Sequence, residues 1–490
     1  MVYPDSVESA RPASLFPVLK ASEQEMRATS ILLSVLRLVP AFSESMLKVM
    51  GAPAGRRSKL SCYTEIVPSK QLENDGSKSR RAKSVNAGLL RPDGLIICAS
   101  QSKNWSAYVE AKIAGNPLDE DQVKSYLRLA ALNGVNAVIT ISTELTIHPT
   151  QSPVVKDKDI PKGVSLFHFS WLSLVTLAAT LNNSREVSDL EQRIVLQELR
   201  TFITHPESKL TGTLTLSSAW PDLIRSFHDQ LSIPASNPLI SDVSEDWMEL
   251  ERYIELSLCS FLGDTVRIVR PKKFQNSREE YGLDIGKGLA SSKQLRLKID
   301  IPNAAANITV SVDLHSKSVL LGMNVQVKQD CRPKTSVTWL VSQLNKLSVP
   351  HGLFLKGSTP RYRNTSDAKF SEVVINPDLL LSDRKINPRS IEIVYSLPQS
   401  AKNITKPKVF AEFLRLQLEE FYKNIAQHVE KYNPPPPRPL EDLSSDVSDA
   451  DESIAKVRAP EQRLSAVEDS RVLESLPAVN NWKDKLGWSS

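Results

Sequence analysis

Two short apolar stretches, joined by a polar connection, constrain the fold of this chain most. Residues 91–98 are Arg-Pro-Asp-Gly-Leu-Ile-Ile-Cys, and residues 105–112 are Trp-Ser-Ala-Tyr-Val-Glu-Ala-Lys. Both patterns are typical of β-strands, in which side chains alternate between two faces. Glu110 and Lys112 therefore share one face, and Asp93 approaches it if the strands are neighbours. We expect two carboxylates and an ammonium group to converge there, an arrangement that can hold a divalent metal ion and a phosphate.

A helix and a further strand follow this pair. Asp119 is placed to cap the helix, and Gln122 three residues later suits a capping box. Gln122 and Tyr126 are four residues apart, so they lie on one helix face. Gly134 ends the helix, and residues 137–141 are an apolar strand. The structural alternative is that Gln122 is a capping residue and Tyr126 a core residue.

The sequence before this core completes an ordered set of elements. Residues 23–50 have a helical pattern with a break near Pro40, and residues 59–67 have a strand pattern. Periodicity therefore predicts the order helix, strand, strand, strand, helix, strand (αβββαβ) for residues 23–141.

Three short motifs occur in this core, and they are Pro92-Asp93, Glu110-x-Lys112 and Gln122-x-x-x-Tyr126. Their order resembles the PD-(D/E)XK nuclease superfamily, and the third motif resembles its RecB-like members. The resemblance implies an α/β fold with a restriction-endonuclease-like αβββαβ core. It also implies an enzyme, a Mg²⁺- or Mn²⁺-dependent deoxyribonuclease that hydrolyses phosphodiester bonds.

The resemblance also assigns roles to residues. The catalytic set is Asp93, Glu110, Lys112, Gln122 and Tyr126. Asp93, Glu110 and the backbone carbonyl of Ala111 would offer hard oxygen ligands to Mg²⁺ or Mn²⁺. Lys112 would orient the attacking water or stabilise developing charge. The Gln and Tyr would support the metal shell or hold the scissile strand.

A further acidic residue often comes from a helix before the first strand in this superfamily. Glu44, in the second part of the helical stretch, and Glu65, in the strand that follows, are the two candidates. The alternative for Glu44 is a solvated surface glutamate.

A polar loop, residues 68–86, leads directly into the Pro-Asp strand. Its basic residues are Lys70, Lys78, Arg80, Arg81 and Lys83. Because its base lies beside the expected site, the loop could grip phosphates of a DNA backbone. The alternative is a solvated run of charge.

Composition limits the classes of protein that remain. The four cysteines are far apart, which argues against a disulfide scaffold or a zinc site and favours a reducing cytoplasm. No apolar run is long enough to span a membrane. The net charge is +5, but residues 441–490 hold eleven acidic and six basic residues, so the first 440 residues carry +10. A basic body suits DNA as a partner.

The chain has 490 residues, enough for two or three domains. We expect a flexible arm (1–22), a nuclease-like domain (23–205), an α+β accessory domain with a largely antiparallel sheet (210–432), and a tail (433–490). The tail begins with four prolines and continues as an acidic segment that we expect to be disordered. It could carry a peptide that binds a protein partner.

The chain also resembles an uncharacterised group of bacterial two-domain proteins sometimes labelled stress-response. The segments that carry this likeness are residues 51–57, 140–143, 167–171 and 332–340. This likeness says nothing about a reaction. Two alternatives to a nuclease therefore stay open: a nucleic-acid-binding protein that does not cleave, and a scaffold in a stress or defence system.

Overall fold

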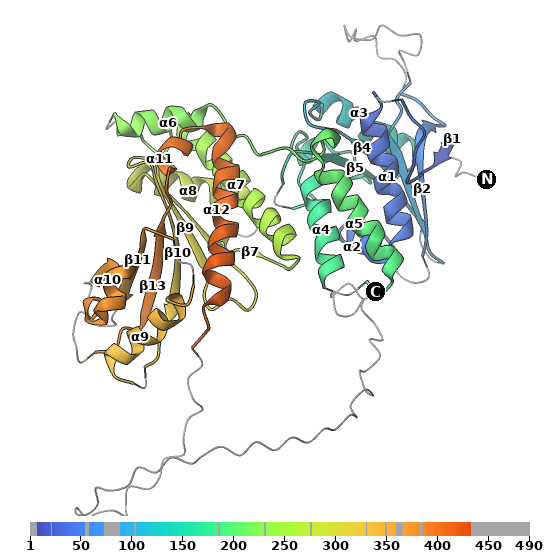
Figure 1. Cartoon of the computed structure of the whole chain (residues 1–490). Coiled ribbons are helices and arrows are strands. Elements are labelled where there is room, and N and C mark those ends of the chain that lie inside the picture. Colours follow the sequence, from blue (N-terminus) through green and yellow to red (C-terminus); the bar gives the residue numbers. More distant parts are fainter. Residues whose placement is uncertain are drawn as a thin grey trace, which may run out of the picture. The chain divides into compact units, whose positions relative to one another are not determined.

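The computed structural model is a mixed α/β protein with two sheets (Figure 1). It describes residues 7–20, 22–53, 58–72, 89–101, 104–146, 148–184, 187–229, 232–274, 277–329, 331–347, 350–358, 366–381 and 386–432. The acidic tail (433–490) and most of the basic loop (73–88) lie outside these residues.

The N-terminal region is built on a six-stranded sheet with the order β1-β2-β3-β4-β5-β6. Its strands are β1 (Val7–Pro12), β2 (Lys59–Pro68), β3 (Gly94–Ala99), β4 (Asn104–Ala111), β5 (Ala137–Ser142) and β6 (Ser165–Ser170). Strands β1 to β4 pair antiparallel, whereas β4, β5 and β6 are parallel. The helices are α1 (Gln24–Leu38), α2 (Pro40–Val49), α3 (Glu120–Asn133), α4 (Trp171–Asn183) and α5 (Leu190–Thr204). The predicted order of elements in residues 23–141 is confirmed.

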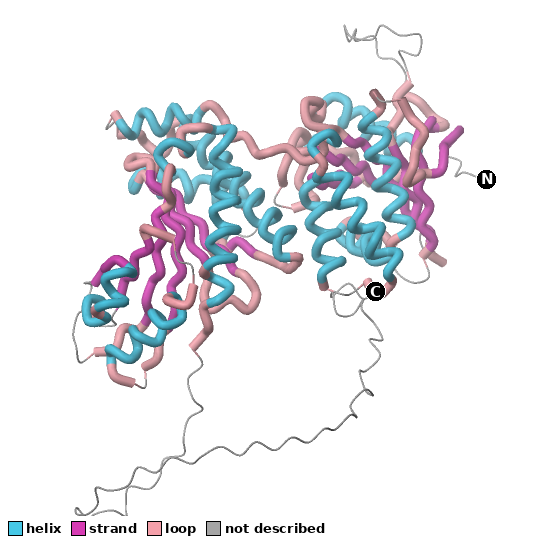
Figure 2. The backbone as a smooth tube through the Cα atoms, in the orientation of Figure 1, coloured by secondary structure: helices cyan, strands magenta, loops and turns pink. Residues whose placement is uncertain are grey.

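Helices cover both faces of this sheet (Figure 2). On one face, apolar residues of α1, α2, α4 and α5 pack against the sheet in one core. On the other face, α3 packs against the sheet in a second core. Trp105, Ala107 and Val109 belong to the first core and Tyr108 to the second, so the predicted alternation along β4 is confirmed.

Residues 7–12 correct the prediction of a flexible N-terminal arm. They form β1, which pairs with β2 through two irregularities in register. The buried residues are Val7, Ala10 and Ala13, three apart rather than two. A regular strand buries alternate residues, so these irregularities removed the pattern by which the strand could be predicted.

The second region is built on a seven-stranded sheet with the order β12-β11-β13-β10-β9-β8-β7. Its strands are β7 (Arg267–Ile268), β8 (Gln294–Asp300), β9 (Ile308–Asp313), β10 (Ser318–Gln326), β11 (Leu353–Ser358), β12 (Ser366–Lys369) and β13 (Ser390–Ser396). Its helices are α6 (Ala219–His228), α7 (Pro238–Leu262), α8 (Arg278–Ser292), α9 (Pro333–Leu344), α10 (Phe370–Ile375), α11 (Ser400–Asn403) and α12 (Pro407–Asn424). All of its strand pairs are antiparallel, as predicted.

The break between α1 and α2 matters for the site. Val39 is extended because the residue before a proline avoids helical backbone angles, and Pro40 then begins α2. The two helix axes consequently differ in direction by 104°. Within the described residues, no single helix has the length and apolar character needed to cross a membrane, although this bent pair meets the same criterion when its halves are taken together.

Candidate active site

Strands β3 and β4 bring Asp93 close to the end of β4 that carries Glu110. Their ladder pairs Gly94 with Val109, so Asp93, just before β3, faces the end of β4. Oδ2 of Asp93 accepts a hydrogen bond of 2.9 Å from the backbone N–H of Ala111, the residue between Glu110 and Lys112. The expected approach of Asp93 to this point of β4 is therefore present.

Glu110 and Lys112 form a buried ion pair. Nζ of Lys112 lies 2.7 Å from Oε1 of Glu110, and their side chains are only 11% and 2% exposed. The backbone of Lys112 is held on both sides, because its N–H donates to the carbonyl of Ile141 (2.7 Å) and its carbonyl accepts from the indole N–H of Trp171 (2.8 Å). The neighbouring parallel strand and α4 thus fix where the ammonium group lies.

A third carboxylate joins this pair from helix α1. Oε2 of Glu25 lies 3.8 Å from Nζ of Lys112, and its Oε1 accepts a 2.5 Å hydrogen bond from the side-chain amide of Asn116. The carboxylate that α1 brings to this site is thus that of Glu25, which sequence reasoning did not name, and the role suggested for Glu44 stays a prediction. Glu44 lies on α2, which the bend at Pro40 turns away from the direction of α1. The signal for Glu25 was its place in the first turn of the helix before the sheet.

Glu65, the other proposed accessory acid, is committed to a different partner. Its carboxylate pairs with the guanidinium of Arg11 at 3.0 Å. Among the described residues, the ion pairs of Lys112 are with Glu110 and Glu25 and not with Glu65, although Glu65 lines the same cavity as Asp93. Sequence reasoning missed Arg11, because β1 was not expected.

The Gln-x-x-x-Tyr pair also lies at this site. The side-chain amide of Gln122 donates to the hydroxyl of Tyr126 (3.3 Å), and that hydroxyl donates to the backbone carbonyl of Arg91 (3.1 Å). The helix cap is made by Asp119, whose carboxylate accepts from the backbone N–H of Gln122 (2.8 Å). The Gln122 side chain is therefore directed to Tyr126, and Tyr126 anchors the backbone two residues before Asp93.

The charges of these groups perturb one another. Burial, and then the charge of Glu110, raises the pKa of Asp93 well above its ordinary 3.8. Burial also raises the pKa of Glu110, against the opposing effect of Lys112. Burial lowers the pKa of Lys112, but the charges of Glu110, Glu25 and Asp93 outweigh this and raise it above 10.5. Lys112 is therefore an ammonium ion at neutral pH, surrounded by more carboxylates than it can neutralise.

One buried oxygen fits a metal ion. Oε2 of Glu110 is buried and has no hydrogen-bond partner in the part of the chain that the structure describes. Leaving a buried charged oxygen unpaired is costly, and a divalent cation removes that cost. Asp93 and Glu110, with a backbone carbonyl such as that of Ala111, are the hard oxygen donors that Mg²⁺ and Mn²⁺ prefer. Across the described ranges no three His, Cys, Asp or Glu side chains form a metal-binding group by themselves, so water or a substrate phosphate would have to complete the shell.

The structure describes the start of the basic loop, which includes Lys70. The backbone of Lys70 exchanges two hydrogen bonds with the side chain of Asn133, at 3.1 and 2.9 Å, so it is tied to the C-terminal end of α3. The other proposed DNA-binding residues, Lys78, Arg80, Arg81 and Lys83, lie outside the described residues.

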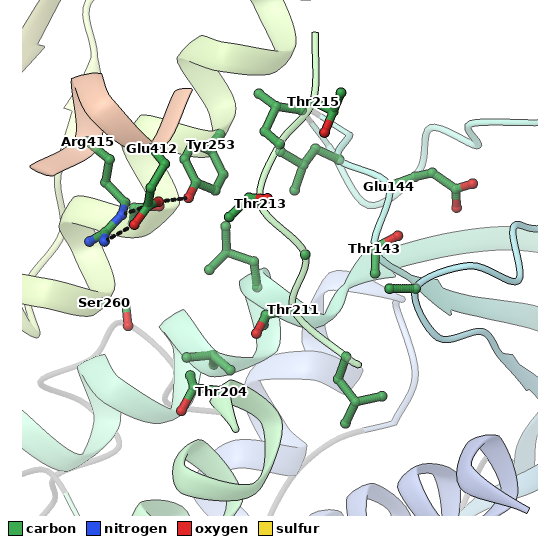
Figure 3. A pocket seen from close by; sticks show the side chains of 18 of the residues that line it. Thr143, Glu144, Thr204, Thr211, Thr213, Thr215, Tyr253, Ser260, Glu412 and Arg415 are labelled. Carbon is green, nitrogen blue, oxygen red and sulfur yellow. Dashed lines mark hydrogen bonds and ion pairs between the residues drawn. The ribbon is translucent and has the colours of Figure 1, made fainter. Parts of the chain in front are cut away.

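A larger cavity, of about 840 Å³, is lined by threonines of residues 211–215 and by Tyr253, Glu412 and Arg415 (Figure 3). Three of its polar groups, those of Tyr253, Glu412 and Arg415, satisfy one another. Glu412 accepts from the Tyr253 hydroxyl at 2.9 Å and from Arg415 at 2.9 and 2.5 Å. Because these groups are already paired, they give no reason to place a reaction there.

Comparison with protein-family models, with curated proteins and with solved structures gave no match.

Proposed function

We propose that this chain is a metal-dependent nuclease with a restriction-endonuclease-like core, which hydrolyses phosphodiester bonds in DNA. The observation that carries the proposal is the meeting of Asp93, Glu110 and Lys112 at the ends of two paired strands, with an unpartnered buried oxygen on Glu110. The basic charge of the first 440 residues supports a polyanion as substrate.

Asp93 and Glu110 would hold Mg²⁺ or Mn²⁺. When bound, such an ion lowers the pKa of a coordinated water and neutralises charge on the phosphate. Lys112 acts as a charged hydrogen-bond donor to the phosphate, because its raised pKa excludes a role as general base at neutral pH. Glu25, whose Oε2 lies 3.8 Å from Nζ of Lys112, would remain a partner of the ammonium group when Glu110 serves as a metal ligand.

Gln122 and Tyr126 are positioning residues in this proposal. The Tyr126 hydroxyl accepts from Gln122 and donates to the backbone carbonyl of Arg91, and it also interacts with Glu110. Replacing Tyr126 by Phe would remove this anchor while keeping the packing of the ring. It should lower kcat, because the carboxylate of Asp93 would be held less tightly.

The test is cleavage of labelled single- and double-stranded DNA by the purified full chain in Mg²⁺ and in Mn²⁺. Asp93→Asn, Glu110→Gln and Lys112→Met should each lose at least about a hundredfold in rate, as expected when a charge that acts on the transition state is removed. Asp121→Asn and Lys124→Met on the outer surface of α3 are matched controls and should cleave normally. Metal-dependent binding without cleavage by the unaltered protein would favour the non-cleaving alternative, and neither binding nor cleavage would favour a scaffold.

A further inference from the structure

A cavity of about 630 Å³ opens beside Asp93. It is bounded by β1, by residues 18–26, by the end of β2 and by the three residues that lead into β3. The β2–β3 ladder ends with the pair Thr64 and Gly94, so Glu65 and Asp93 are the next residues on these two neighbouring chain segments. The cavity is thus continuous with one ligand of the proposed metal.

Arg11 is held in this cavity with half of its guanidinium free. Its Nε lies 3.0 Å from Oε2 of Glu65, and its Nη1 lies 3.0 Å from Oε1. The Nη1 contact is a hydrogen bond, and within the described residues both N–H donors on Nη2 are left without an acceptor. The Arg11 side chain is 75% exposed. A planar fork with free donors at a fixed position is suited to a phosphate.

The backbone of Glu65 indicates that this position is built rather than accidental. Its φ is +52°, in the left-handed region that side chains other than glycine rarely adopt. It lies where the register of β1 against β2 shifts, between the pairs formed by Ser9 and Arg11. Such strain persists where the surroundings impose it, and it is concentrated at functional sites. Here it presents the carboxylate that orients Arg11.

The remaining lining combines two cations with an apolar wall and one carboxylate, that of Glu23, which accepts a hydrogen bond from the backbone N–H of Lys20 at 3.0 Å. Lys20 and Arg91 line the cavity, and neither has an ion pair within the described residues. Val18, Leu19 and Met26 supply apolar surface, and Val18 is fully exposed. Sites for single-stranded nucleic acid place cations along the backbone and a flat apolar, usually aromatic, surface against the bases. In this cavity the apolar surface is aliphatic. The volume is that of a pocket for one small ligand, too little for a duplex.

We propose that this cavity binds an unpaired nucleotide of the DNA strand, next to the scissile phosphate. Arg11, oriented by Glu65, holds its phosphate, and Lys20 and Arg91 neutralise the neighbouring backbone. The base lies against Val18. This inference rests on the proposed nuclease function and adds a substrate class: single strands or frayed ends rather than uninterrupted duplex.

The first test measures binding of a fluorescent 12-nucleotide single strand to the full chain in Ca²⁺, across a range of salt. Arg11→Ala should weaken binding about tenfold and reduce the slope of log K against log salt by about 0.7, the contribution of one phosphate contact to a single strand. Arg193→Ala, an exposed arginine on α5, is the matched control and should leave both unchanged. Arg11→Lys should recover the slope but only part of the affinity, because it keeps the charge and loses the fork.

The second test separates this inference from the nuclease proposal. The unaltered protein should cleave a single strand or a duplex with unpaired ends at least about tenfold faster than a closed circular duplex, and Glu65→Gln should raise KM more than it lowers kcat. Mn²⁺ affinity of the Arg11 variants should stay that of the unaltered chain, which also shows that the site is folded. If the protein cleaves but Arg11→Ala binds like the control, or the circular duplex is cleaved equally fast, the inference is overturned while the nuclease proposal stands. Absence of any binding or cleavage by the unaltered protein would overturn both.

Discussion

Replacing Lys112 by methionine should destabilise the metal-free site in a way that depends strongly on pH. The substitution keeps the length and packing of the side chain but leaves the carboxylate of Glu110, which is 2% exposed, without its cation. Breaking a buried ion pair on one side typically costs about 3–5 kcal/mol. Glu110 can escape part of this cost by taking up a proton.

The ceiling on that cost follows from the ordinary pKa of 4.5 for Glu110. Protonating such a group costs about 1.4 kcal/mol for each pH unit above its pKa. The stability lost by leaving Glu110 without Lys112 therefore cannot exceed the cost of protonating Glu110, which is about 5 kcal/mol at pH 8 and about 1.4 kcal/mol at pH 5.5. The cost of burying a neutral carboxyl is small and comes in addition. The sign is set by burial, which raises the pKa in the folded state. The folded variant holds the proton more tightly than the unfolded chain, and so it recovers stability as pH falls.

Hydrogen exchange of the backbone amides in residues 104–112 measures this locally, without requiring the whole chain to unfold in one step. Compared with the unaltered protein at the same pH, Lys112→Met should exchange about 100- to 1,000-fold faster at pH 8 and less than about tenfold faster at pH 5.5. The double variant Glu110→Gln, Lys112→Met should lie within about tenfold at both values. A loss of protection that is the same at both pH values, or that persists in the double variant, would refute the reasoning, because Glu110 would then not be a buried charge that Lys112 compensates.

Two further predictions concern the same end of the sheet. Gly94→Ala should destabilise the protein by about 1–3 kcal/mol and reduce cleavage, because the new Cβ would lie 2.6 Å from Cδ1 of Leu33, which is fully buried. Thermal unfolding measures the loss of stability. Gly288→Ala is the control that should not be destabilised, because no atom lies within 4 Å of the added Cβ there. Affinity for Mn²⁺ should rise between pH 5 and pH 8, because burial raises the pKa values of Asp93 and Glu110 above their ordinary 3.8 and 4.5 and a metal ligand must first lose its proton. Without metal, those same protons stabilise the folded form, so stability should fall as pH rises above about 4. Calorimetric titration showing an affinity independent of pH would contradict the assignment of these carboxyls as ligands.

The sequence was informative where function depends on local geometry. Glu110 and Lys112 share a face because strand side chains alternate, and the approach of Asp93 was expected on the condition that the two strands are neighbours. Gln122 and Tyr126 are related by one helical turn, a spacing fixed by the helix itself. In each case the regular repeat of a strand or helix fixes which nearby side chains share a face.

The residues that sequence reasoning missed are placed by packing between distant segments. Glu25 and Glu44 belong to the same predicted helical stretch, and it is the packing of α1 near the sheet that brings Glu25 to Lys112. Arg11 lies more than fifty positions from Glu65 along the chain. Its strand had no alternating pattern, because two register shifts replaced the spacing of two by a spacing of three.

Strand β1 also covers an edge of the sheet on which a second molecule could otherwise add a strand. Without it, β2 would present a row of unpaired backbone N–H and C=O groups at the margin of the sheet, a template on which another chain can add a strand. The strand that covers this margin is itself a poor template, since its ladder is irregular and it ends in Pro12, which has no N–H to donate. Shortening the N-terminus to residue 13 would therefore do more than remove Arg11. It would open the margin to strand exchange and aggregation, so expression tags and fusion partners are better joined at a point that leaves residues 7–12 in place.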